Sequence, residues 1–493
     1  MSISAARRPV TDESVTYQNL IDGKWQPASD GRMLDVVSPS DGLPFARLAR
    51  GTESDIDAAV KAARHALEEG AWGKLTAVER GRLLMKLGQS VLEHFDELAE
   101  LEARDTGKPM KQALADITAA ARYFEFYGAG ADKVHGDVVP FLDGYMVTVL
   151  REPKGVTGHI IPWNYPAQMF GRTLAPALAM GNATVVKPAE EACLTPVRLA
   201  QLAQEVGFPA GAINLVTGLG EEAGAALSSH PGIDFISFTG SPEVGTLVQI
   251  AAAKNHIGCT LELGGKSPQI VFEDTDFDAV VPVVVSAIVQ NGGQTCSAGS
   301  RVLVQKSIYE EFVARVAARF QSLRVGSHAM DLDCGPLISS TQKNRVLGFV
   351  EQAKKDGVKV LAEGSIADGT PARGFYVAPV LFGPVPRNNQ LACEEVFGPV
   401  LSILPFEDEA DGVRLANSTD YGLVAGIWTR DGGRQMRVAK KMRCGQVFVN
   451  GYGAGGGIEL PFGGVKKSGH GREKGFEAMR EFSNAKTVVF KHG

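Results

Sequence analysis

One cysteine of this sequence lies where nucleophilic chemistry is feasible. Cys296 follows Gly292-Gly293-Gln294-Thr295 and precedes Ser297-Ala298-Gly299, so glycines flank it on both sides. Glycines at such points let backbone and substrate approach closely. A thiolate there would attack an electrophilic carbon, although most cysteines taken singly are buried small hydrophobes. Cys296 is therefore the candidate nucleophile.

The remaining cysteines have no comparable setting. They form no CxxC pair and lie far apart, so we predict neither a disulfide framework nor a zinc or other metal site. This pattern favours a reducing, cytoplasmic location. The five are Cys193, Cys259, Cys334, Cys393 and Cys444.

Two further residues have the side chains that acyl chemistry needs. Glu262 lies between two leucines in Leu261-Glu262-Leu263-Gly264-Gly265. Burial there would raise the pKa of its carboxyl, which suits a general base, whereas a glutamate facing outward from an edge strand is the simpler alternative. Asn164 lies in Pro162-Trp163-Asn164-Tyr165-Pro166. Its amide N–H groups would stabilise an oxyanion, although a turn asparagine is the more common role.

A second group of residues is typical of phosphate and ribose binding. Gly240 ends a predicted strand, Ser241 caps the next helix and Pro242 starts it. Such a helix N-terminus offers free N–H groups to a phosphate, or it is a well-capped turn without a ligand. Lys187 and Glu190 follow another strand, where they would bind ribose hydroxyls or form a solvated pair. The pattern Gly218-Leu219-Gly220 lacks the third glycine of the usual dinucleotide motif.

The elements that position these residues alternate regularly. Strands and helices follow one another from Gly155 to Leu263, which indicates a parallel sheet with helices on both faces. Ligands bind at the carboxyl ends of such strands. Strands are predicted at 155–161, 183–187, 213–216, 233–238 and 259–263, with helices at 169–180, 196–206, 221–229 and 242–253. A second α/β series starts after Gly264-Gly265, with strands at 269–272 and 301–304 and helices at 277–289 and 309–323.

Helical periodicity also marks the N-terminal part. Apolar residues from Ile56 to Leu67 recur at helical spacing, and a second helix is predicted from about 77 to 103, before Gly107-Lys108-Pro109. Strands at 141–151 and 486–490 have no partner nearby in sequence. Each would pair with another subunit or form an ordinary edge strand.

Composition excludes several classes of protein. The 493 residues carry 50 lysines and arginines against 56 aspartates and glutamates, a net charge of −6, so neither nucleic acid nor an anionic membrane is predicted as a partner. No apolar run approaches the roughly 20 residues of a membrane span. Residues 1–18 contain no apolar segment of a secretory signal.

Taken together, these motifs closely resemble one family, the NAD(P)-dependent aldehyde dehydrogenases of the hydrolytic, acid-forming branch. The resemblance covers about residues 19–489, nearly the whole chain. The motifs occur in the family's order: NLIDGKW at 19–25, PWNYP at 162–166, KPAE at 187–190, FTGSPEVG at 238–245, LELGGKSP at 261–268, GQTCSAGSR at 293–301, EEVFGPV at 394–400 and PFGGVKKSGHGRE at 461–473.

The resemblance implies a role for each matching position. Cys296 is expected to be the nucleophile, Glu262 the base, and Asn164 with the Cys296 backbone N–H the oxyanion hole. The remaining expectations are NAD contacts, with NADP less favoured, and substrate contacts. The cofactor set is Lys187, Glu190, Ser241, Gly240, Gly245, Trp163, Glu395 and Phe397, and the substrate set is Arg172, Tyr165, Met169 and Phe462.

The family's architecture is implied in the same way. The fold class is α/β, with a Rossmann-type cofactor domain, a second α/β catalytic domain and a small β oligomerisation arm. We expect the NAD-binding domain at 1–131 and 154–264, the catalytic domain at 265–468, and the arm at 132–153 and 469–493. The resemblance also implies that the protein is a homodimer or homotetramer and that it acts on a small-molecule aldehyde.

The substrate is less defined, because two features depart from the common family pattern. Arg172 stands where many relatives have an aromatic residue, as in succinate-semialdehyde-type members, and would bind a substrate carboxylate or pair with an acidic side chain. The stretch Gly453-Ala454-Gly455-Gly456-Gly457 replaces an aromatic wall and predicts a wider entrance, which also suits an aromatic or bulky aldehyde.

Other activities fit less well. A cysteine hydrolase would need a histidine partner and its own motif around Cys296. Relatives that acylate CoA usually lack the water-activating glutamate, which this chain has as Glu262. A relative that had kept only the fold would be free to lose Cys296, Glu262 or Asn164, and all three are present.

Overall fold

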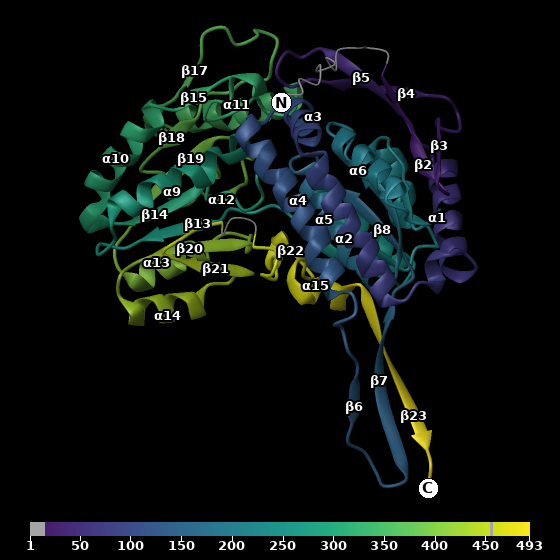
Figure 1. Ribbon diagram of the computed structural model, residues 1–493. Helices are drawn as coiled ribbons and strands as arrows, with labels where there is room; N and C mark the ends of the chain where they lie inside the picture. Colours follow the sequence, from purple (N-terminus) through teal and green to yellow (C-terminus); the bar gives the residue numbers. More distant parts are fainter. Residues whose placement is uncertain (1–14, 454–456) are drawn as a thin grey trace, which may run out of the picture.

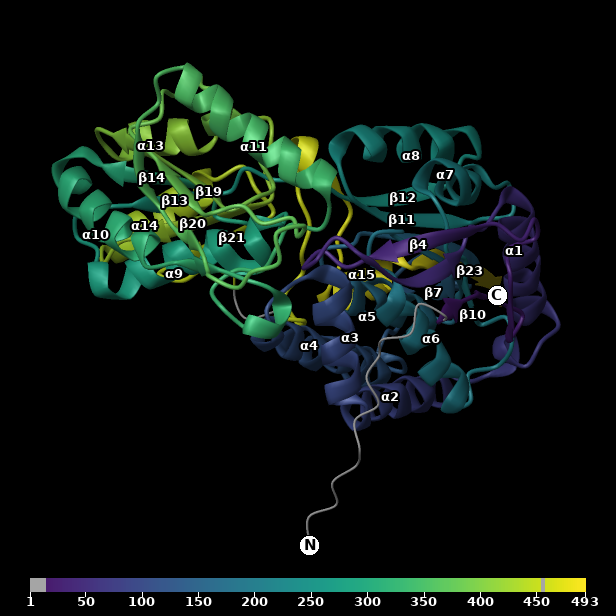
Figure 2. The ribbon, with the colours of Figure 1, turned by 90° about the horizontal axis from the view of Figure 1, so that it is seen from above.

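Two α/β bodies lie side by side, and a narrow three-stranded arm projects from one of them (Figure 1). This computed structural model describes residues 15–453 and 457–493. Seen from above, the body with helices α9 to α14 lies beside the body with α1 to α8 (Figure 2). The α/β class expected from the sequence is therefore confirmed.

The first body is built on an eight-stranded sheet with the order β22-β12-β11-β8-β9-β10-β2-β3. The five strands from β12 to β10 in this order are parallel, while β2, β3 and β22 run antiparallel to their neighbours. The strands are β2 (Asn19–Ile21), β3 (Lys24–Gln26), β8 (Val156–Ile161), β9 (Ala183–Pro188), β10 (Ile213–Leu215), β11 (Phe235–Thr239), β12 (Gly258–Glu262) and β22 (Gly469–His470).

The order of these strands reverses between β8 and β11. From β8 the chain continues to β9 and β10 on one side, then crosses back to β11 and β12 on the other. Right-handed crossovers therefore place α5 and α6 on one face of the sheet and α7 and α8 on the opposite face. A reversal of this kind opens a crevice at the carboxyl ends of the strands. The helices of this body are α1 (Glu53–Glu68), α2 (Ala77–Glu93), α3 (Phe95–Thr106), α4 (Met110–Gly130), α5 (Pro166–Ala179), α6 (Leu194–Glu205), α7 (Ala225–Ser229) and α8 (Pro242–Lys254).

The second body has a seven-stranded sheet with the order β16-β18-β19-β14-β13-β20-β21. All of its strand pairs are parallel except β16 with β18. The strands are β13 (Pro268–Val271), β14 (Arg301–Gln305), β16 (Val360–Glu363), β18 (Val380–Phe382), β19 (Val400–Phe406), β20 (Val424–Trp428) and β21 (Gln446–Val449). The helices are α9 (Phe277–Val289), α10 (Tyr309–Gln321), α11 (Ser340–Lys355), α12 (Gln390–Cys393), α13 (Glu409–Ala416) and α14 (Gly432–Lys441).

Two smaller sheets complete the bodies. Strands β1, β5 and β4 form one, and β15 with β17 forms the other. They are β1 (Thr16–Tyr17), β4 (Met33–Val37), β5 (Pro44–Ala49), β15 (Arg324–Val325) and β17 (Ser365–Ile366). None of the helices in the described ranges combines the length and apolar character that crossing a membrane requires.

The arm sheet contains β6 (Asp137–Val139), β7 (Tyr145–Pro153) and β23 (Ser483–Lys491). The two strands predicted without partners pair with each other, in a continuous antiparallel register from Ser483–Pro153 to Lys491–Tyr145. The arm takes less of the C-terminus than the predicted 469–493. Because β22 extends the first sheet beside β12 and α15 (Gly475–Glu481) packs on α5, only β23 lies in the arm.

The single helix predicted from about 77 to 103 is wrong, since the structure has two. Helix α2 ends at Glu93 and α3 begins at Phe95, with His94 between them at φ −105°, ψ 25°, outside helical geometry. Apolar periodicity continues across His94, so the sequence pattern hides the break. The predicted stop is confirmed, because Gly107 ends α3 at φ +80°.

Candidate active site

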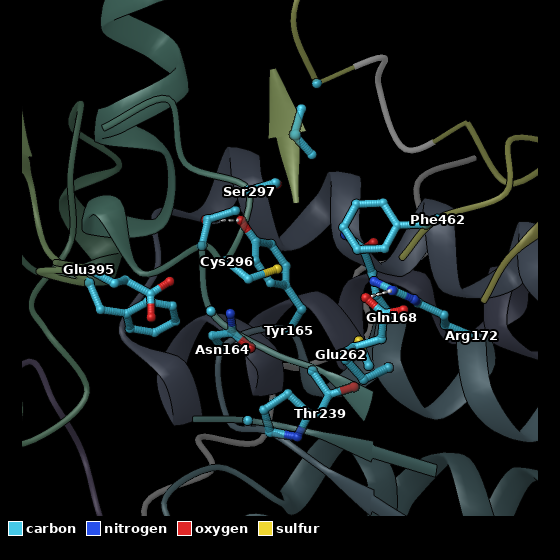
Figure 3. Close-up of a pocket in the computed structure, with 18 of the residues that line it drawn as sticks. Asn164, Tyr165, Gln168, Arg172, Thr239, Glu262, Cys296, Ser297, Glu395 and Phe462 are labelled. Carbon is cyan, nitrogen blue, oxygen red and sulfur yellow. Dashed lines mark hydrogen bonds and ion pairs between the residues drawn. The ribbon is translucent and has the colours of Figure 1, made fainter. Parts of the chain in front are cut away.

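A cavity of about 510 Å³ lies at the carboxyl ends of β8, β11 and β12, between the two bodies. It is lined by most of the residues that the sequence singles out, and Figure 3 shows several of them around one space. Those residues are Trp163, Asn164, Tyr165, Met169, Arg172, Gly240, Ser241, Glu262, Cys296, Glu395, Phe397 and Phe462. The strand-to-helix turns of one body therefore face the Cys296 loop of the other.

Cys296 is carried by the loop that follows α9. A short turn at Gln290–Gly293 redirects the chain, and Asn291, Gly292 and Gly293 all have positive φ. Gly265 approaches this loop so closely that a Cβ there would lie 2.6 Å from the Cys296 carbonyl oxygen. Burial raises the pKa of the Cys296 thiol to about 12, and the nearby Arg172 opposes this shift. The resting side chain is thus a thiol whose proton must be removed before it attacks.

Hydrogen bonds fix both the side chain and the backbone carbonyl of Asn164. Its Nδ2 donates to the Gln294 carbonyl at 2.9 Å. Its own backbone carbonyl accepts from Lys108 Nζ at 3.0 Å and from Asn291 Nδ2 at 2.9 Å. These bonds tie the turn after β8 to the Cys296 loop, and they fix the Asn164 amide beside the cysteine (Figure 3).

Lys108 belongs to a buried charge cluster behind this turn. Its ammonium pairs with Glu102 at 3.1 Å and with Asp116 at 2.5 Å. All three side chains are buried, and the Lys108 Nζ also lies 4.6 Å from the centre of the Tyr165 ring. The Tyr165 hydroxyl in turn bonds the Thr295 hydroxyl at 2.7 Å, next to the cysteine. The sequence analysis identifies Lys108 only as part of the helix stop at Gly107-Lys108-Pro109, without a role in the site.

Glu262 is the last residue of β12 and is 2% exposed. Pairing with β11 on one side and β22 on the other closes both edges of its strand, so it does not face outward from an edge. Burial raises the pKa of its carboxyl well above the usual range, and the Glu473 charge adds to this effect while Arg172 opposes it. The direction agrees with the sequence prediction for a general base.

Arg172 lies on α5, lines the cavity and is 8% exposed. Its Nε forms an ion pair with Glu473, and its Nη2 lies 3.8 Å from Glu262 Oε2. The guanidinium carbon is 4.3 Å from the centre of the Phe462 ring, and Figure 3 shows Arg172, Glu262 and Phe462 close together. The structure therefore contains the acidic partners that were one of the two alternatives for Arg172.

The opposite end of the cavity carries the residues expected to contact a cofactor. Ser241 caps α8 by accepting from Val244 N at 3.3 Å. The rings of Trp163 and Phe397 meet edge to face, with centroids 5.4 Å apart. Glu395 accepts from Gly265 N at 2.8 Å, and burial raises the pKa of its carboxyl to about 7.

Three expected cofactor contacts lie outside the lining of this cavity. Lys187 and Glu190 pair at 2.6 Å, and Glu190 also accepts from Gly220 N at 3.2 Å. This places them beside the turn that precedes α7. Gly245 packs inside α8 against Leu263, whose Cδ2 would be 2.6 Å from a Cβ at this position. A side chain at this position would clash with Leu263, so packing requires glycine here.

The cavity also contains residues that the sequence analysis did not single out. They include Gln168, Gln290, Gln446, Phe448, Tyr452, Leu460 and Lys474. Glu473 was quoted within a motif without a role. No local signal marks these residues, because their partners come from distant segments. Of the glycine-rich stretch at 453–457, Gly453 and Gly457 line the cavity, and residues 454–456 lie outside the described residues.

Comparison with known proteins gives one consistent family. A family model described as "Aldehyde dehydrogenase family" matches residues 25–488. Retinal dehydrogenase 2 from Homo sapiens is 41% identical over 488 residues, which cover 98% of this chain and 93% of that protein. The mitochondrial aldehyde dehydrogenase of Equus caballus is 40% identical over 492 residues, covering 99% and 98%.

Solved structures agree with this result. A protein from Burkholderia cenocepacia superposes with a TM-score of 0.96 at 60% identity, covering 97% of this chain and 100% of that one. An NAD+ complex of aldehyde dehydrogenase from Bacillus cereus gives a TM-score of 0.95 at 38% identity, covering 98% of each chain. Betaine aldehyde dehydrogenase from Staphylococcus aureus, also with NAD+, gives 0.94 at 34% identity, covering 97% and 95%.

Proposed function

This chain belongs to the aldehyde dehydrogenase family, and we propose that it oxidises its aldehyde to a carboxylic acid with NAD through a thioester on Cys296. The observation that carries this proposal is the convergence of Cys296, Glu262 and Asn164 on one cavity. A thiol, a buried carboxyl and an amide donor are the groups that acyl chemistry on an aldehyde requires.

The first step is attack on the aldehyde. Glu262 accepts the thiol proton, and the Cys296 sulfur bonds to the carbonyl carbon, which leaves a negative charge on the oxygen. An amide nitrogen carries two N–H bonds. Asn164 uses one for Gln294 and directs the other to this oxyanion, together with the backbone N–H of Cys296.

The hydride of this adduct would pass to NAD bound in the cavity, and a thioester would remain on Cys296. Glu262 first releases the thiol proton to solvent, and its carboxylate then takes a proton from a water molecule, whose oxygen attacks the thioester carbon. The carbon–sulfur bond breaks, the acid leaves, and the thiolate is restored. Burial of Glu262 suits this work, because a raised pKa makes the carboxylate a stronger base.

The donor set at the other end of the cavity fits a dinucleotide. The N-terminus of α8 offers N–H groups to a pyrophosphate, and Ser241 would hold its oxygens. Thr239 Oγ1 is buried in the cavity wall without a hydrogen-bond partner among the described residues. Lys187 and Glu190 would bind the adenosine ribose, and Glu395 and Phe397 the nicotinamide ribose and ring. The NAD+ complexes of two similar structures support this choice of cofactor.

For the substrate, we propose an aldehyde that carries a carboxylate away from its reacting carbon. Two cationic side chains, Arg172 and Lys474, line the substrate end of the cavity. A cationic aldehyde, as the name betaine aldehyde dehydrogenase indicates for one relative, would be repelled there. The rest of the wall is apolar and aromatic, with Phe448, Tyr452, Leu460 and Phe462. This lining favours an aromatic aldehyde with a carboxylate substituent over a very short aliphatic semialdehyde.

The experiment is an assay of NADH absorbance with a panel of aldehydes, in which the product is identified as the free acid. NADH formation that needs no CoA and a free-acid product support the proposal. Product formation without NAD would instead indicate a cysteine hydrolase, and strict dependence on CoA would indicate the acylating branch.

For assembly, we propose a homo-oligomer formed through the arm. The arm carries exposed apolar side chains that a second copy would cover. They include Val138, Met146, Val489 and Phe490 in its strands, and Phe141 and Leu142 in the segment between β6 and β7. Sedimentation of the wild type against a Phe141→Ser, Leu142→Ser variant tests this, because a monomeric wild type would contradict it.

A further inference from the structure

Two tyrosines, one from each body, bind the residues on either side of Cys296. Tyr165 lies directly before α5, and its hydroxyl forms a hydrogen bond with the Thr295 hydroxyl at 2.7 Å. The Tyr452 hydroxyl donates to the Ser297 carbonyl, also at 2.7 Å. Figure 3 shows Tyr165, Cys296 and Ser297 close together. The cysteine is therefore placed between two neighbours that are both anchored.

The two hydrogen bonds fix different parts of the loop. Tyr165 meets a side chain of Thr295, which can rotate without moving the backbone. Tyr452 meets a backbone carbonyl, which belongs to a planar peptide unit and cannot move separately from the chain. Of the two tyrosines, Tyr452 is thus the one that fixes the course of the chain directly after the nucleophile.

The position of Tyr452 is itself well determined. It lies shortly after β21, where the backbone N–H of Asn450 donates to the Ile427 carbonyl of β20 at 2.8 Å. The ring packs over Gly426 of the same strand, where a Cβ would lie 2.9 Å from Tyr452 Cδ2. On another side the centre of the Phe448 ring is 5.9 Å away. These contacts direct the hydroxyl toward the cysteine loop.

The backbone of Ser297 acts on the cysteine thiol. Burial raises the pKa of the Cys296 thiol to about 12, whereas Arg172 and a hydrogen bond from the Ser297 backbone N–H lower it. An N–H group directed at the sulfur stabilises the thiolate over the thiol. This N–H and the carbonyl that Tyr452 holds belong to the same residue, so fixing one limits the rotation of the other.

Tyr452 also lines the cavity, so a direct contact with the substrate is the alternative role. A tyrosine hydroxyl has a single hydrogen to donate. In Tyr452 that hydrogen is directed to the Ser297 carbonyl. A substrate oxygen could receive it only if this bond were broken, which favours an action through the loop.

We propose that Tyr452 is a positioning residue for the nucleophile, because it holds the Ser297 carbonyl and thereby keeps the Ser297 backbone N–H directed at the Cys296 sulfur. This inference rests on the proposed function, in which Cys296 is the nucleophile. It goes beyond that function by naming the residue that supports the thiolate from outside the motif of the cysteine loop.

The variant Tyr452→Phe tests the proposal, because it keeps the ring and removes only the hydroxyl. The measured quantity is the rate at which iodoacetamide alkylates Cys296 without any aldehyde, followed by mass spectrometry of the peptide that contains Cys296. The rate should fall by about 2- to 4-fold. This factor corresponds to one lost hydrogen bond, partly offset because a thiolate of higher pKa is a better nucleophile. N-ethylmaleimide, a bulkier reagent, should show the same factor.

Tyr376→Phe is the matched control. The Tyr376 hydroxyl is buried and donates to the Ser40 carbonyl at 2.6 Å, and Tyr376 is not among the residues that line the cavity. Both variants therefore lose one hydrogen bond from a tyrosine to a backbone carbonyl, and urea unfolding should show similar losses of stability. Only Tyr452→Phe should slow the alkylation of Cys296.

Three alkylation results would overturn the role of Tyr452. The first is a wild-type rate in Tyr452→Phe. The second is an equal fall in Tyr376→Phe, which would indicate a general loosening of the protein. The third is a fall with only one of the two reagents, which would indicate a change in the shape of the cavity.

Stopped-flow formation of NADH gives a second readout. In Tyr452→Phe the maximal rate of the first turnover should fall by at least 2-fold, while the NAD concentration at half saturation should stay at the wild-type value. A change in the half-saturating concentration alone would contradict the positioning role. A wild type that forms no NADH with any aldehyde would instead overturn the proposed function, and the alkylation rates would still decide the role of Tyr452.

Discussion

The Nη2 atom of Arg172 lies 3.8 Å from Oε2 of Glu262. This places a buried cation beside the carboxyl that we propose as the general base. Burial alone would keep that carboxyl protonated, and the Arg172 charge is the main force that opposes this. Glu473 shares the same guanidinium, so the strength of the base depends on a three-residue charge balance.

Removing Arg172 should damage the protein in a way that does not depend on substrate charge. Arg172→Leu leaves Glu473 and Glu262 without their cation, and breaking a buried pair from one side costs about 3–5 kcal/mol of stability. Urea unfolding measures this loss. The double variant Arg172→Leu, Glu473→Gln should recover part of it, because the Glu473 carboxylate is no longer buried without its cation. Additive losses in the double variant would contradict the pairing.

Substitutions of Cys296 and of Glu262 should impair different steps of the reaction. Cys296→Ala removes the nucleophile and should abolish NADH formation. Glu262→Gln should slow hydrolysis of the thioester more than its formation, so a rapid burst of NADH followed by slow turnover is expected. Stopped-flow absorbance resolves the two phases. Wild-type turnover by Cys296→Ala would exclude the thioester route.

NAD should be preferred over NADP. A phosphate on the adenosine ribose would lie near the Glu190 carboxylate, which Lys187 holds in place at 2.6 Å. The repulsion is worth about 1–3 kcal/mol, or roughly 10- to 100-fold in kcat/KM. Glu190→Gln should narrow this preference, with Glu221→Gln as an acidic control nearby. An equal kcat/KM for the two cofactors in the wild type would refute this placement.

Activity should rise with pH over the neutral and alkaline range. Burial raises the pKa of Cys296 to about 12 and that of Glu262 well above its usual range. Attack requires a thiolate and an ionised Glu262 to accept the thiol proton, so each rise in pH increases the fraction of enzyme that can react. The profile of kcat/KM for an uncharged aldehyde reports these free-enzyme groups. A profile that falls steadily above neutral pH would contradict the pKa directions.

Lys108 should matter for the oxyanion hole although it lies behind the cavity. Its ammonium bonds the Asn164 carbonyl at 3.0 Å and pairs with Glu102 and Asp116. Lys108→Met leaves two buried carboxylates without a cation, which should cost about 3–5 kcal/mol of stability. The combined variant Lys108→Met, Asp116→Asn should be more stable than the single one but still low in kcat. Normal kcat in that combined variant would show that Asn164 needs no such support.

The sequence by itself determined the local elements and the motif positions. The alternation of strands and helices from Gly155 onward predicts the parallel sheet, because apolar periodicity and turn residues act over a few positions. It also predicts a strand at 259–263 with Glu262 near its end and a helix capped by Ser241; the structure confirms both elements, and the strand ends at Glu262 itself. The sequence does not predict the break at His94, because the apolar pattern continues through this position without a glycine or proline.

Only the tertiary structure decided which distant groups meet. Arg172 finds Glu473 from the far end of the chain, and β7 pairs with β23 rather than with a neighbour. Lys474 reaches the cavity because hydrogen bonds between the segments around Phe462 and Glu473 enforce a backbone conformation that lysine avoids. The net charge at the substrate end depends on these long-range contacts. Burial and charge pairing are properties of the packed molecule, and no short window of sequence contains them.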